Sequence, residues 1–225
     1  MEIGELVLEV TRKCNMLCEH CLRGNAQAMN MSHKVIDNLL NKVTCISTVA
    51  FTGGEPTLNV NAIKYFTQQI RDKHITVGYF YVVTNGKIQS MALIKALLDL
   101  YILCEEQDMC GLCVSRDQYH EGCKTPLYEA ITFYHPNDRA EKIPSEAILS
   151  EGRAEYNGLG CRYVKREGWE LNDGILGGTV YISSNGNVLD ACNLSYEHID
   201  EDPIGNILTE DFESIVNRFA ERDQD

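Results

Sequence analysis

The sequence predicts an α/β protein built on a parallel sheet, because strand-like apolar runs alternate with helix-like segments over its first two thirds. Two further observations support this class. Each strand-like run is followed by a polar segment that carries Gly, Asn or Ser. Strand–helix–strand units are right-handed and place the carboxyl ends of their strands at one edge. We therefore expect these polar segments to meet at one end of the sheet, where parallel barrels gather their functional groups.

The first half of the chain contains two strand–helix units. Glu5–Val10 alternates and is rich in β-branched residues, which predicts a strand. Ser32 is typical of a helix N-cap and predicts a helix over His33–Lys42. Ile46–Phe51 predicts the second strand, and apolar residues at helical spacing predict a helix over Asn61–Asp72.

Further strand–helix units follow with weaker signals toward residue 150. Val77–Val83 is a near-continuous apolar run, typical of a buried strand that ends in a turn. A strong helical pattern covers Gln89–Tyr101, and Cys110–Val114 predicts a fourth strand. We expect a helix over Pro126–Phe133 and a short fifth strand over Ala147–Leu149.

The pattern changes from about Cys161 onward. Thr179–Ser183 and Val188–Asp190 predict a hairpin joined by a two-residue turn at Asn185-Gly186. A closing helix is expected over Asp211–Phe219. The sequence thus indicates two parts, a β/α core over 1–155 and a small appendage over 156–225.

Composition excludes several classes of function. The 225 residues carry a formal net charge of −13, which disfavours nucleic acid as a partner. The N-terminus lacks a basic segment followed by a long apolar stretch, and no run has the roughly 18 apolar residues needed to span a membrane. We therefore expect a cytoplasmic protein. The chain has ten cysteines, and some of them are clustered. In a reducing compartment such as the cytoplasm, clustered cysteines bind metal more often than they form disulfides.

Cys14, Cys18 and Cys21 form a C-x3-C-x2-C array directly after the first predicted strand. Three cysteine thiolates can ligate three irons of a cubane cluster and leave the fourth iron open, as a catalytic site requires. The alternatives are a zinc site completed by a distant ligand such as His20 or His33, or cysteines that only pack.

This array, together with Thr52-Gly53-Gly54-Glu55-Pro56 after the second strand, resembles the radical S-adenosylmethionine (SAM) enzyme superfamily. The resemblance covers roughly Glu5 to Arg153. It implies a partial, open β/α barrel that holds a [4Fe–4S] cluster on Cys14, Cys18 and Cys21. It also implies that SAM binds the open iron and is reductively cleaved to a 5′-deoxyadenosyl radical, which removes a hydrogen atom from the substrate.

The resemblance assigns roles to further residues. Gly53 and Gly54 allow close approach to a ligand, Glu55 meets the SAM amine, and His20 lies against the adenine. Polar residues after later strands are expected to bind the ribose hydroxyls and the methionine carboxylate of SAM: Asn85, Ser115, Asp117 and Arg153. The alternative for Asn85 and Asp117 is that they only stabilise turns, as Asn and Asp often do. The alternative for Arg153 is that it is an ordinary surface arginine. His120 and Glu121 are expected to be ordinary loop residues, and the alternative is that they face the substrate.

The C-terminal part is similar to the SPASM or twitch appendages of this superfamily, but only in part. Two cysteines, Cys161 and Cys192, do not complete a second cubane, so we expect no auxiliary cluster. Either thiol is a candidate hydrogen-atom donor to a substrate radical. Four further cysteines are expected to pack as small apolar residues: Cys104, Cys110, Cys113 and Cys123.

The resemblance to SPASM relatives favours a peptide or protein substrate. A small molecule or nucleotide is the second hypothesis, because the short appendage leaves the barrel mouth open. A protein that binds a cluster or metal without catalysis is the third. For an active enzyme the resemblance implies a reducing partner such as flavodoxin or ferredoxin.

Overall fold

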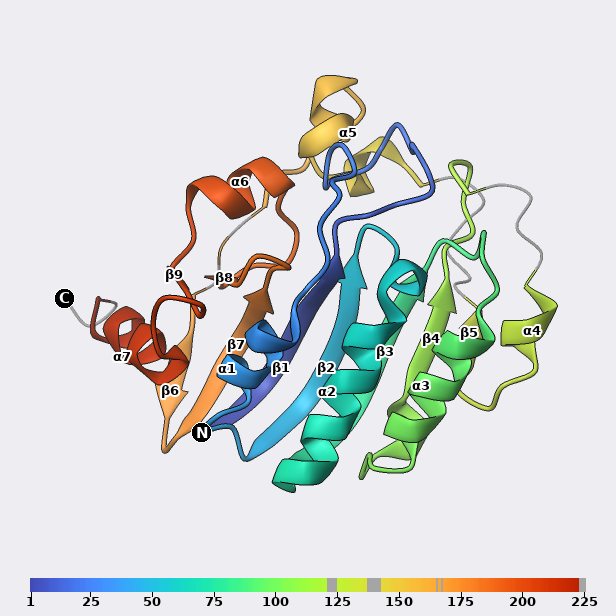
Figure 1. Cartoon of the computed structure of the whole chain (residues 1–225). Coiled ribbons are helices and arrows are strands. Elements are labelled where there is room, and N and C mark those ends of the chain that lie inside the picture. Colours follow the sequence, from blue (N-terminus) through green and yellow to red (C-terminus); the bar gives the residue numbers. More distant parts are fainter. Residues whose placement is uncertain (121–124, 137–142, 165, 167, 223–225) are drawn as a thin grey trace.

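Strand β1 (Glu2–Thr11) lies at the centre of a mostly parallel sheet (Figure 1). The computed structural model describes residues 1–120, 125–136, 143–164, 166 and 168–222. β1 pairs in parallel with β2 (Cys45–Gly53) on one side and with β7 (Ile175–Ile182) on the other. The two strands that flank the cysteine array in sequence are therefore neighbours in space.

The sheet is open and extends to both sides of this centre in the order β5-β4-β3-β2-β1-β7-β8-β9, with β6 paired to β7. β1 to β5 and β7 are parallel, whereas β6, β8 and β9 pair antiparallel with their neighbours. The predicted open, parallel α/β architecture is confirmed. The remaining strands are β3 Thr76–Thr84, β4 Gly111–Val114, β5 Tyr134–Pro136, β6 Glu170–Asn172, β8 Asn187–Leu189 and β9 Gly205–Asn206.

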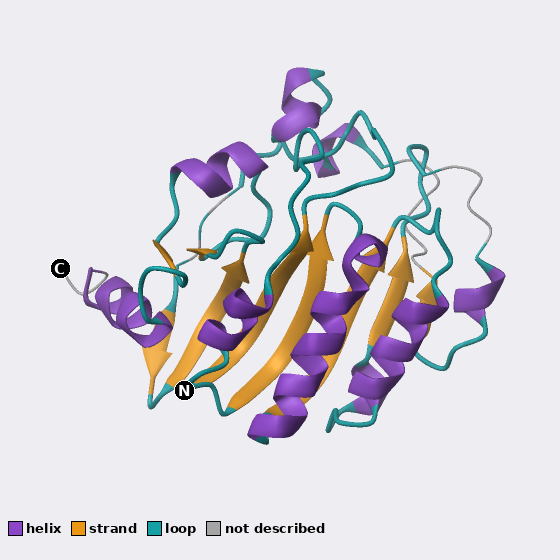
Figure 2. Cartoon of the chain, in the orientation of Figure 1, coloured by secondary structure: helices purple, strands orange, loops and turns teal. Residues whose placement is uncertain are grey.

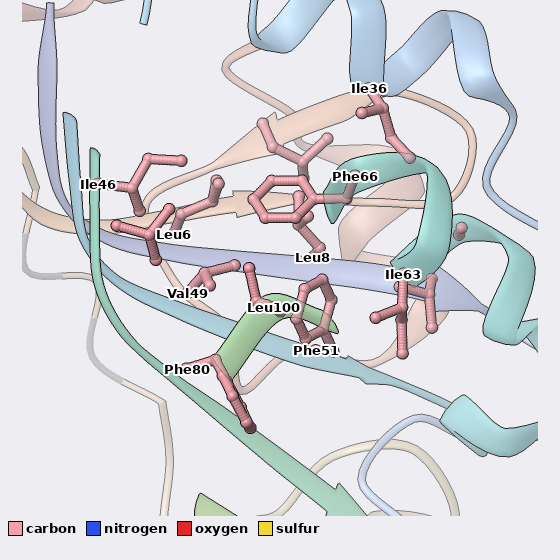
Figure 3. Close-up of a cluster of buried hydrophobic side chains, with 14 of the residues drawn as sticks. Leu6, Leu8, Ile36, Ile46, Val49, Phe51, Ile63, Phe66, Phe80 and Leu100 are labelled. Atoms are coloured by element: carbon pink, nitrogen blue, oxygen red, sulfur yellow. The ribbon is translucent and has the colours of Figure 1, made fainter. Parts of the chain in front are cut away.

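Helices α1 (His33–Leu39), α2 (Val60–Lys73) and α3 (Met91–Tyr101) lie on one face of the sheet (Figure 2). Side chains alternate between the two faces of a strand, so every second residue of β1, β2 and β3 points to these helices. The resulting core is apolar and fully buried, and Figure 3 shows part of it: Leu6, Leu8, Val49, Phe51, Phe66 and Phe80.

Shorter helices lie in the connections. Most of them follow the carboxyl ends of strands, and α5 sits above the loop that follows β1 in Figure 1. Among the described residues, no helix combines the length and the apolar composition that crossing a lipid bilayer requires. The short helices are η1 Pro56–Asn59, η2 Gln107–Met109, α4 Pro126–Glu129, η3 Ser145–Ala147, α5 Gly152–Tyr156 and α6 Tyr196–Glu201. The longer α7 (Phe212–Arg222) follows the last strand.

The predictions between residues 126 and 149 were partly wrong. The helix expected over Pro126–Phe133 ends at Glu129, and Phe133 is buried at the start of the chain segment that becomes β5. The expected strand Ala147–Leu149 is instead a 3-10 turn followed by an isolated bridge from Leu149 to Arg162. The fifth strand is instead β5, Tyr134–Pro136, which pairs with β4.

The C-terminal hairpin is present, but its turn is longer than predicted. The Ser183 amide donates to the Asn187 carbonyl at 2.9 Å, which leaves a three-residue loop that ends at Gly186 with φ +86°. Three-residue hairpin loops commonly place a glycine in this conformation. The hairpin also joins the main sheet, since β7 pairs with β1. The division between 155 and 156 stays a prediction.

Candidate active site

A cavity of about 830 Å³ lies on the face of the sheet opposite α1 to α3. Tyr81 and Val83 of β3 and Thr179 of β7 line it. The β3 residues alternate with Phe80 and Val82, which are buried toward the helices. Further lining residues come from the segments 143–149, 162–164 and 190–193. The cavity therefore opens between the sheet and chain segments that follow its carboxyl edge, where we expected the functional groups to gather.

The three cysteines of the array lie in the loop after β1, and each is half-buried. Burial raises the pKa of the Cys14 thiol. The pKa of Cys18 is raised to about 11, first by burial and then by the neighbouring charges of Cys21 and Cys14. Three neighbouring thiols form a donor set that suits a cationic metal centre, because ligation stabilises the thiolates. The residues present fit a cluster with three protein ligands.

The glycines after β2 fix the position of this loop. The Gly54 and Glu55 amides donate to the carbonyls of Thr11 and Lys13, both at 2.8 Å. A Cβ on Gly53 would lie 2.1 Å from the Thr11 oxygen, and one on Gly54 would lie 2.2 Å from the Lys13 oxygen. The close approach that requires glycine here is thus with the backbone just before Cys14.

Glu55 is buried and points its carboxylate at the end of β3. Its Oε1 accepts hydrogen bonds from the Thr57 amide, the Thr57 hydroxyl and the Thr84 hydroxyl, at 3.1, 2.8 and 2.7 Å. Its Oε2 accepts from the Asn85 amide at 2.8 Å. A carboxylate oxygen accepts more than one donor, so Oε2 retains capacity for an ammonium group while the others hold the carboxylate still.

Helix α5 supports the cysteine loop from the other side. The Arg153 amide donates to the Cys21 carbonyl at 2.9 Å, and its Nε donates to the Cys18 carbonyl at 3.0 Å. Gly152, with φ +54°, packs so closely that a Cβ would lie 2.4 Å from the Leu22 oxygen. Arg153 is therefore placed to hold the loop, and the SAM contact assigned to it stays a prediction.

His20 lies on the cavity wall, where its ring stacks on Tyr119 with centroids 3.9 Å apart. Burial lowers the pKa of His20, which favours the neutral ring. Its Nδ1 is buried and has no hydrogen-bond partner in the described structure. Asp117 also lines the cavity and binds the His120 ring at 2.8 Å. His120 lines the cavity too, and its role stays a prediction; Glu121 lies outside the described residues.

Ser115 lines the cavity, and its amide donates to the Thr84 carbonyl at 2.9 Å. Asn85 is instead turned toward the cysteine loop, where its Nδ2 donates to Asn15 Oδ1 at 2.8 Å. Ser115, His20 and Asp117 therefore line the same cavity, whereas Asn85 contacts the cysteine loop and is not among the residues that line the cavity.

The C-terminal segment is tied to the cysteine loop by the buried Arg23. Its two terminal nitrogens donate to the carbonyls of Leu194 and Cys192, both at 2.7 Å. Cys192 is half-buried and lines the cavity. Cys161 is exposed, and its thiol donates to the Ser145 carbonyl at 3.3 Å. Of the two candidate hydrogen donors, Cys192 is the one that reaches the cavity.

The remaining cysteines follow their predicted role where the structure describes them. Cys104, Cys110 and Cys113 are buried around β4, and the first two belong to the main hydrophobic core. Cys123 lies outside the described residues.

Glu151 and His198 join α5 to α6, and they give folding a pH-dependent contribution. The hydrogen bond to Glu151 raises the pKa of His198. Because the folded value exceeds the unfolded value of about 6.5, this stabilisation is complete below that pH and fades as the pH rises through the folded pKa. We expect the difference in melting temperature between the wild type and His198→Gln to be larger at about pH 6 than at about pH 8.5.

The exposed His74, which ends α2, provides the control for this measurement. His74→Asn is expected to show no such trend, because Asn tolerates its left-handed conformation and no acidic partner is lost. A melting difference for His198→Gln that is flat or grows with pH would contradict the prediction.

Several of these residues carry no signal of their own in the sequence. Tyr119, Arg23 and Gly152 act through contacts with residues far along the chain. The Glu151-Gly152-Arg153 segment did stand out, but as a possible SAM contact.

Comparison with known proteins agrees with this geometry. Residues 4–106 match the family of 4Fe-4S single cluster domains. The chain is 32% identical over 102 residues to the uncharacterized protein MJ0907 of Methanocaldococcus jannaschii, a match that spans 43% of this chain and 35% of that protein. The chain thus spans about a third of this relative's length.

The fold is similar to that of anSMEcpe. The hexahistidine-tagged protein with bound AdoMet superposes with a TM-score of 0.50 at 13% identity, over 97% of this chain and 80% of that one. The native protein with AdoMet and the Kp18Cys peptide gives a TM-score of 0.50 at 12% identity, over 97% and 83%. The chain is thus similar to 4Fe-4S single cluster domains over residues 4–106 and shares the fold of anSMEcpe over most of its length.

Proposed function

We propose that this chain is an enzyme that binds a [4Fe–4S] cluster on Cys14, Cys18 and Cys21 and cleaves SAM reductively at it. The observation that carries the proposal is the shared edge of β1 and β2. The loop with the three thiols and the loop with Glu55 are hydrogen-bonded to each other there, beside a cavity. When bound, the cluster supplies one electron to SAM, which gives methionine and a 5′-deoxyadenosyl radical.

The protein residues orient the bound molecule. Glu55 Oε2 accepts from the SAM amine, and the neutral ring of His20 packs against the adenine. From the next wall of the cavity, Ser115 meets the ribose or the methionine carboxylate, and Asp117 accepts from the ribose hydroxyls. Arg153 keeps the cysteine loop in place, because it donates twice to carbonyls of that loop.

The proposed substrate is a peptide or protein. The cavity is of a size typical of ligand sites, and the related fold of anSMEcpe has been solved with a peptide. An electron donor of the flavodoxin or ferredoxin type completes the system. Its proposed role follows from the single electron that the cleavage consumes.

The test is the formation of 5′-deoxyadenosine. Protein purified without oxygen and reconstituted with iron and sulfide is incubated with SAM and dithionite, and the products are separated by chromatography. We expect 5′-deoxyadenosine and methionine in equal amounts. A protein that carries a full cluster and forms neither product would be a cluster-binding protein without this activity.

Cys192 is the proposed hydrogen-atom donor. Its S–H bond breaks as a C–H bond forms on the substrate radical, and one electron and one proton from the reducing partner restore the thiol. Thiol hydrogens exchange with solvent, so product formed in D₂O is expected to gain deuterium in the wild type and in Cys161→Ala, but not in Cys192→Ala. Mass spectrometry of the product measures this. Equal uptake by Cys192→Ala would remove Cys192 from the reaction.

A further inference from the structure

Two exposed lysines lie beside the start of the cysteine loop. Lys13 directly precedes Cys14, and Lys87 lies in the turn that follows β3. Hydrogen bonds join the two segments, because Asn85 Nδ2 donates to Asn15 Oδ1 at 2.8 Å and the Lys87 amide donates to Asn85 Oδ1 at 3.0 Å. The two lysines therefore belong to one continuous stretch of surface next to the proposed cluster ligands.

This stretch is locally basic, although the chain as a whole is acidic. Its three segments, 13–17, 54–59 and 85–91, contain one acidic residue, Glu55, which is buried. Among the described residues, neither Lys13 nor Lys87 forms an ion pair. The whole chain carries 33 acidic against 20 basic side chains, so an uncompensated positive potential here sets this surface apart.

Exposed apolar side chains accompany the lysines on the same two segments. Leu17 of the cysteine loop and Met91 at the start of α3 are 79% and 62% exposed, and Ile88 is also exposed. A single exposed apolar residue is ordinary, but three beside two unpaired lysines have the composition of a protein–protein contact, which combines apolar area with charge. We call Lys13, Leu17, Lys87, Ile88 and Met91 the lysine surface.

The lysine surface is separate from the cavity. Of the described residues that line the cavity, none belongs to this surface. A partner bound to it would therefore leave the cavity free for SAM and substrate. It would also lie next to the proposed cluster, because Lys13 is bonded to Cys14. Electron transfer slows steeply with distance, so a protein that reduces the cluster must bind this close to it.

We propose that the lysine surface docks an acidic one-electron carrier protein, which reduces the cluster from outside the cavity. A net charge of −13 repels such a carrier from the average surface of this protein, whereas Lys13 and Lys87 attract it to this one place. The carrier is oxidised by one electron and the cluster is reduced by one, and no bond forms or breaks. The proposal rests on the function proposed above, since it names where the electron for SAM cleavage enters.

The first test maps the contact by crosslinking. The probe is a purified acidic flavodoxin, mixed without oxygen with the reconstituted protein at low salt. A carbodiimide joins carboxylates of the flavodoxin to lysine amines in direct contact with them, and mass spectrometry identifies the lysines. We expect crosslinks at Lys13 and Lys87 that disappear at high salt. The control is Lys73, exposed where α2 ends at the opposite edge of the sheet, which is expected to form none.

Two crosslinking results would overturn the proposal. One is a flavodoxin that links to Lys73 as often as to Lys13 and Lys87, or to neither of these two. The other is a link from Lys13 or Lys87 to a second copy of this chain when no flavodoxin is present, which would make the lysine surface a site of self-association.

The second test compares two reductants. Lys13→Glu/Lys87→Glu reverses both charges, and Arg71→Glu/Lys73→Glu makes the same change in net charge at the exposed end of α2. For each protein, the rate of 5′-deoxyadenosine formation with limiting flavodoxin hydroquinone is divided by the rate with dithionite, a small reductant that needs no docking surface. We expect this ratio to fall about 10-fold in Lys13→Glu/Lys87→Glu and to stay at the wild-type value in the control.

The single variant Lys87→Glu keeps the test decisive if the double variant loses its cluster. Lys87 is far from the cysteines in sequence, and its reversal alone is expected to lower the ratio about 3-fold. Equal ratios in Lys87→Glu, the control and the wild type would overturn the proposal.

Failure of this proposal is distinguishable from failure of the proposed function. A wild type that forms 5′-deoxyadenosine with dithionite, but whose flavodoxin-driven rate is insensitive to the charge reversals, has the function and lacks this docking site. A wild type that forms no 5′-deoxyadenosine with either reductant lacks the function, and the crosslinks still report whether the carrier binds at Lys13 and Lys87.

Discussion

Cys18→Ala is expected to abolish both the visible absorbance of the iron–sulfur cluster and the formation of 5′-deoxyadenosine. The physical reason is the number of ligands. A cubane held by three thiolates has no spare protein ligand, and Cys18 is the central one of the three, with its pKa raised by burial and by Cys21 and Cys14. Loss of this thiolate leaves two cysteines, which do not hold the cluster in a geometry that keeps one iron open.

Cys45→Ala is the matched control. Cys45 is also half-buried and free, but it begins β2 and so lies at the other end of the sheet from the cysteine array. It is expected to retain iron content and 5′-deoxyadenosine formation. Iron and sulfide analysis with absorbance spectroscopy measures the first, and chromatography the second. A Cys18→Ala protein with wild-type iron content would contradict the assigned ligands.

The sequence predicts the first four strands and the helices between them because their signals are local. β1 to β4 and α1 to α3 overlap the expected ranges, and their buried faces follow the expected periods. The position of the site follows from the same topology, since the motifs come directly after β1 and β2. Local patterning is strong wherever one face of an element must be buried.

The outer parts of the sheet were not predictable in this way. β5 has only three residues, and its place is decided by pairing with β4 rather than by its own pattern. β7 carries a strand signal, but nothing local indicates that it pairs in parallel with β1, some 170 residues earlier. Long-range contacts decide which strand pairs at the edge of the sheet, and a single sequence does not reveal those contacts.

The same limit applies within the site. The cysteines and Glu55 are recognisable from spacing, whereas the contact from Arg153 to the Cys18 carbonyl spans 135 positions. Asp190 directly follows β8 and belongs to no motif, and only burial beside a cavity sets it apart. Residues proposed to contact a cofactor belong to recognisable sequence motifs. The residues that hold those motifs in place are determined by long-range packing, which leaves no local pattern.

Gly152→Ala is expected to destabilise the protein by about 2–4 kcal/mol and to lower the rate of SAM cleavage about 100-fold. An added Cβ would lie 2.4 Å from the Leu22 oxygen and 2.5 Å from the Gly24 nitrogen, both backbone atoms of the cysteine loop. Either α5 or this loop must shift. Since Arg153 donates to the Cys18 and Cys21 carbonyls from the next position, the shift carries the proposed cluster ligands with it.

Gly158→Ala separates this packing effect from backbone strain. Gly158 has φ +64°, close to the +54° of Gly152, but a Cβ there would meet nothing within 4 Å. It is therefore expected to lose about 1 kcal/mol from strain alone and to keep its iron. Melting temperature, iron per chain and 5′-deoxyadenosine formation are compared for the two variants. Equal losses would mean that strain rather than contact governs position 152, and the close packing of Gly152 would then have no part in shaping the cysteine loop.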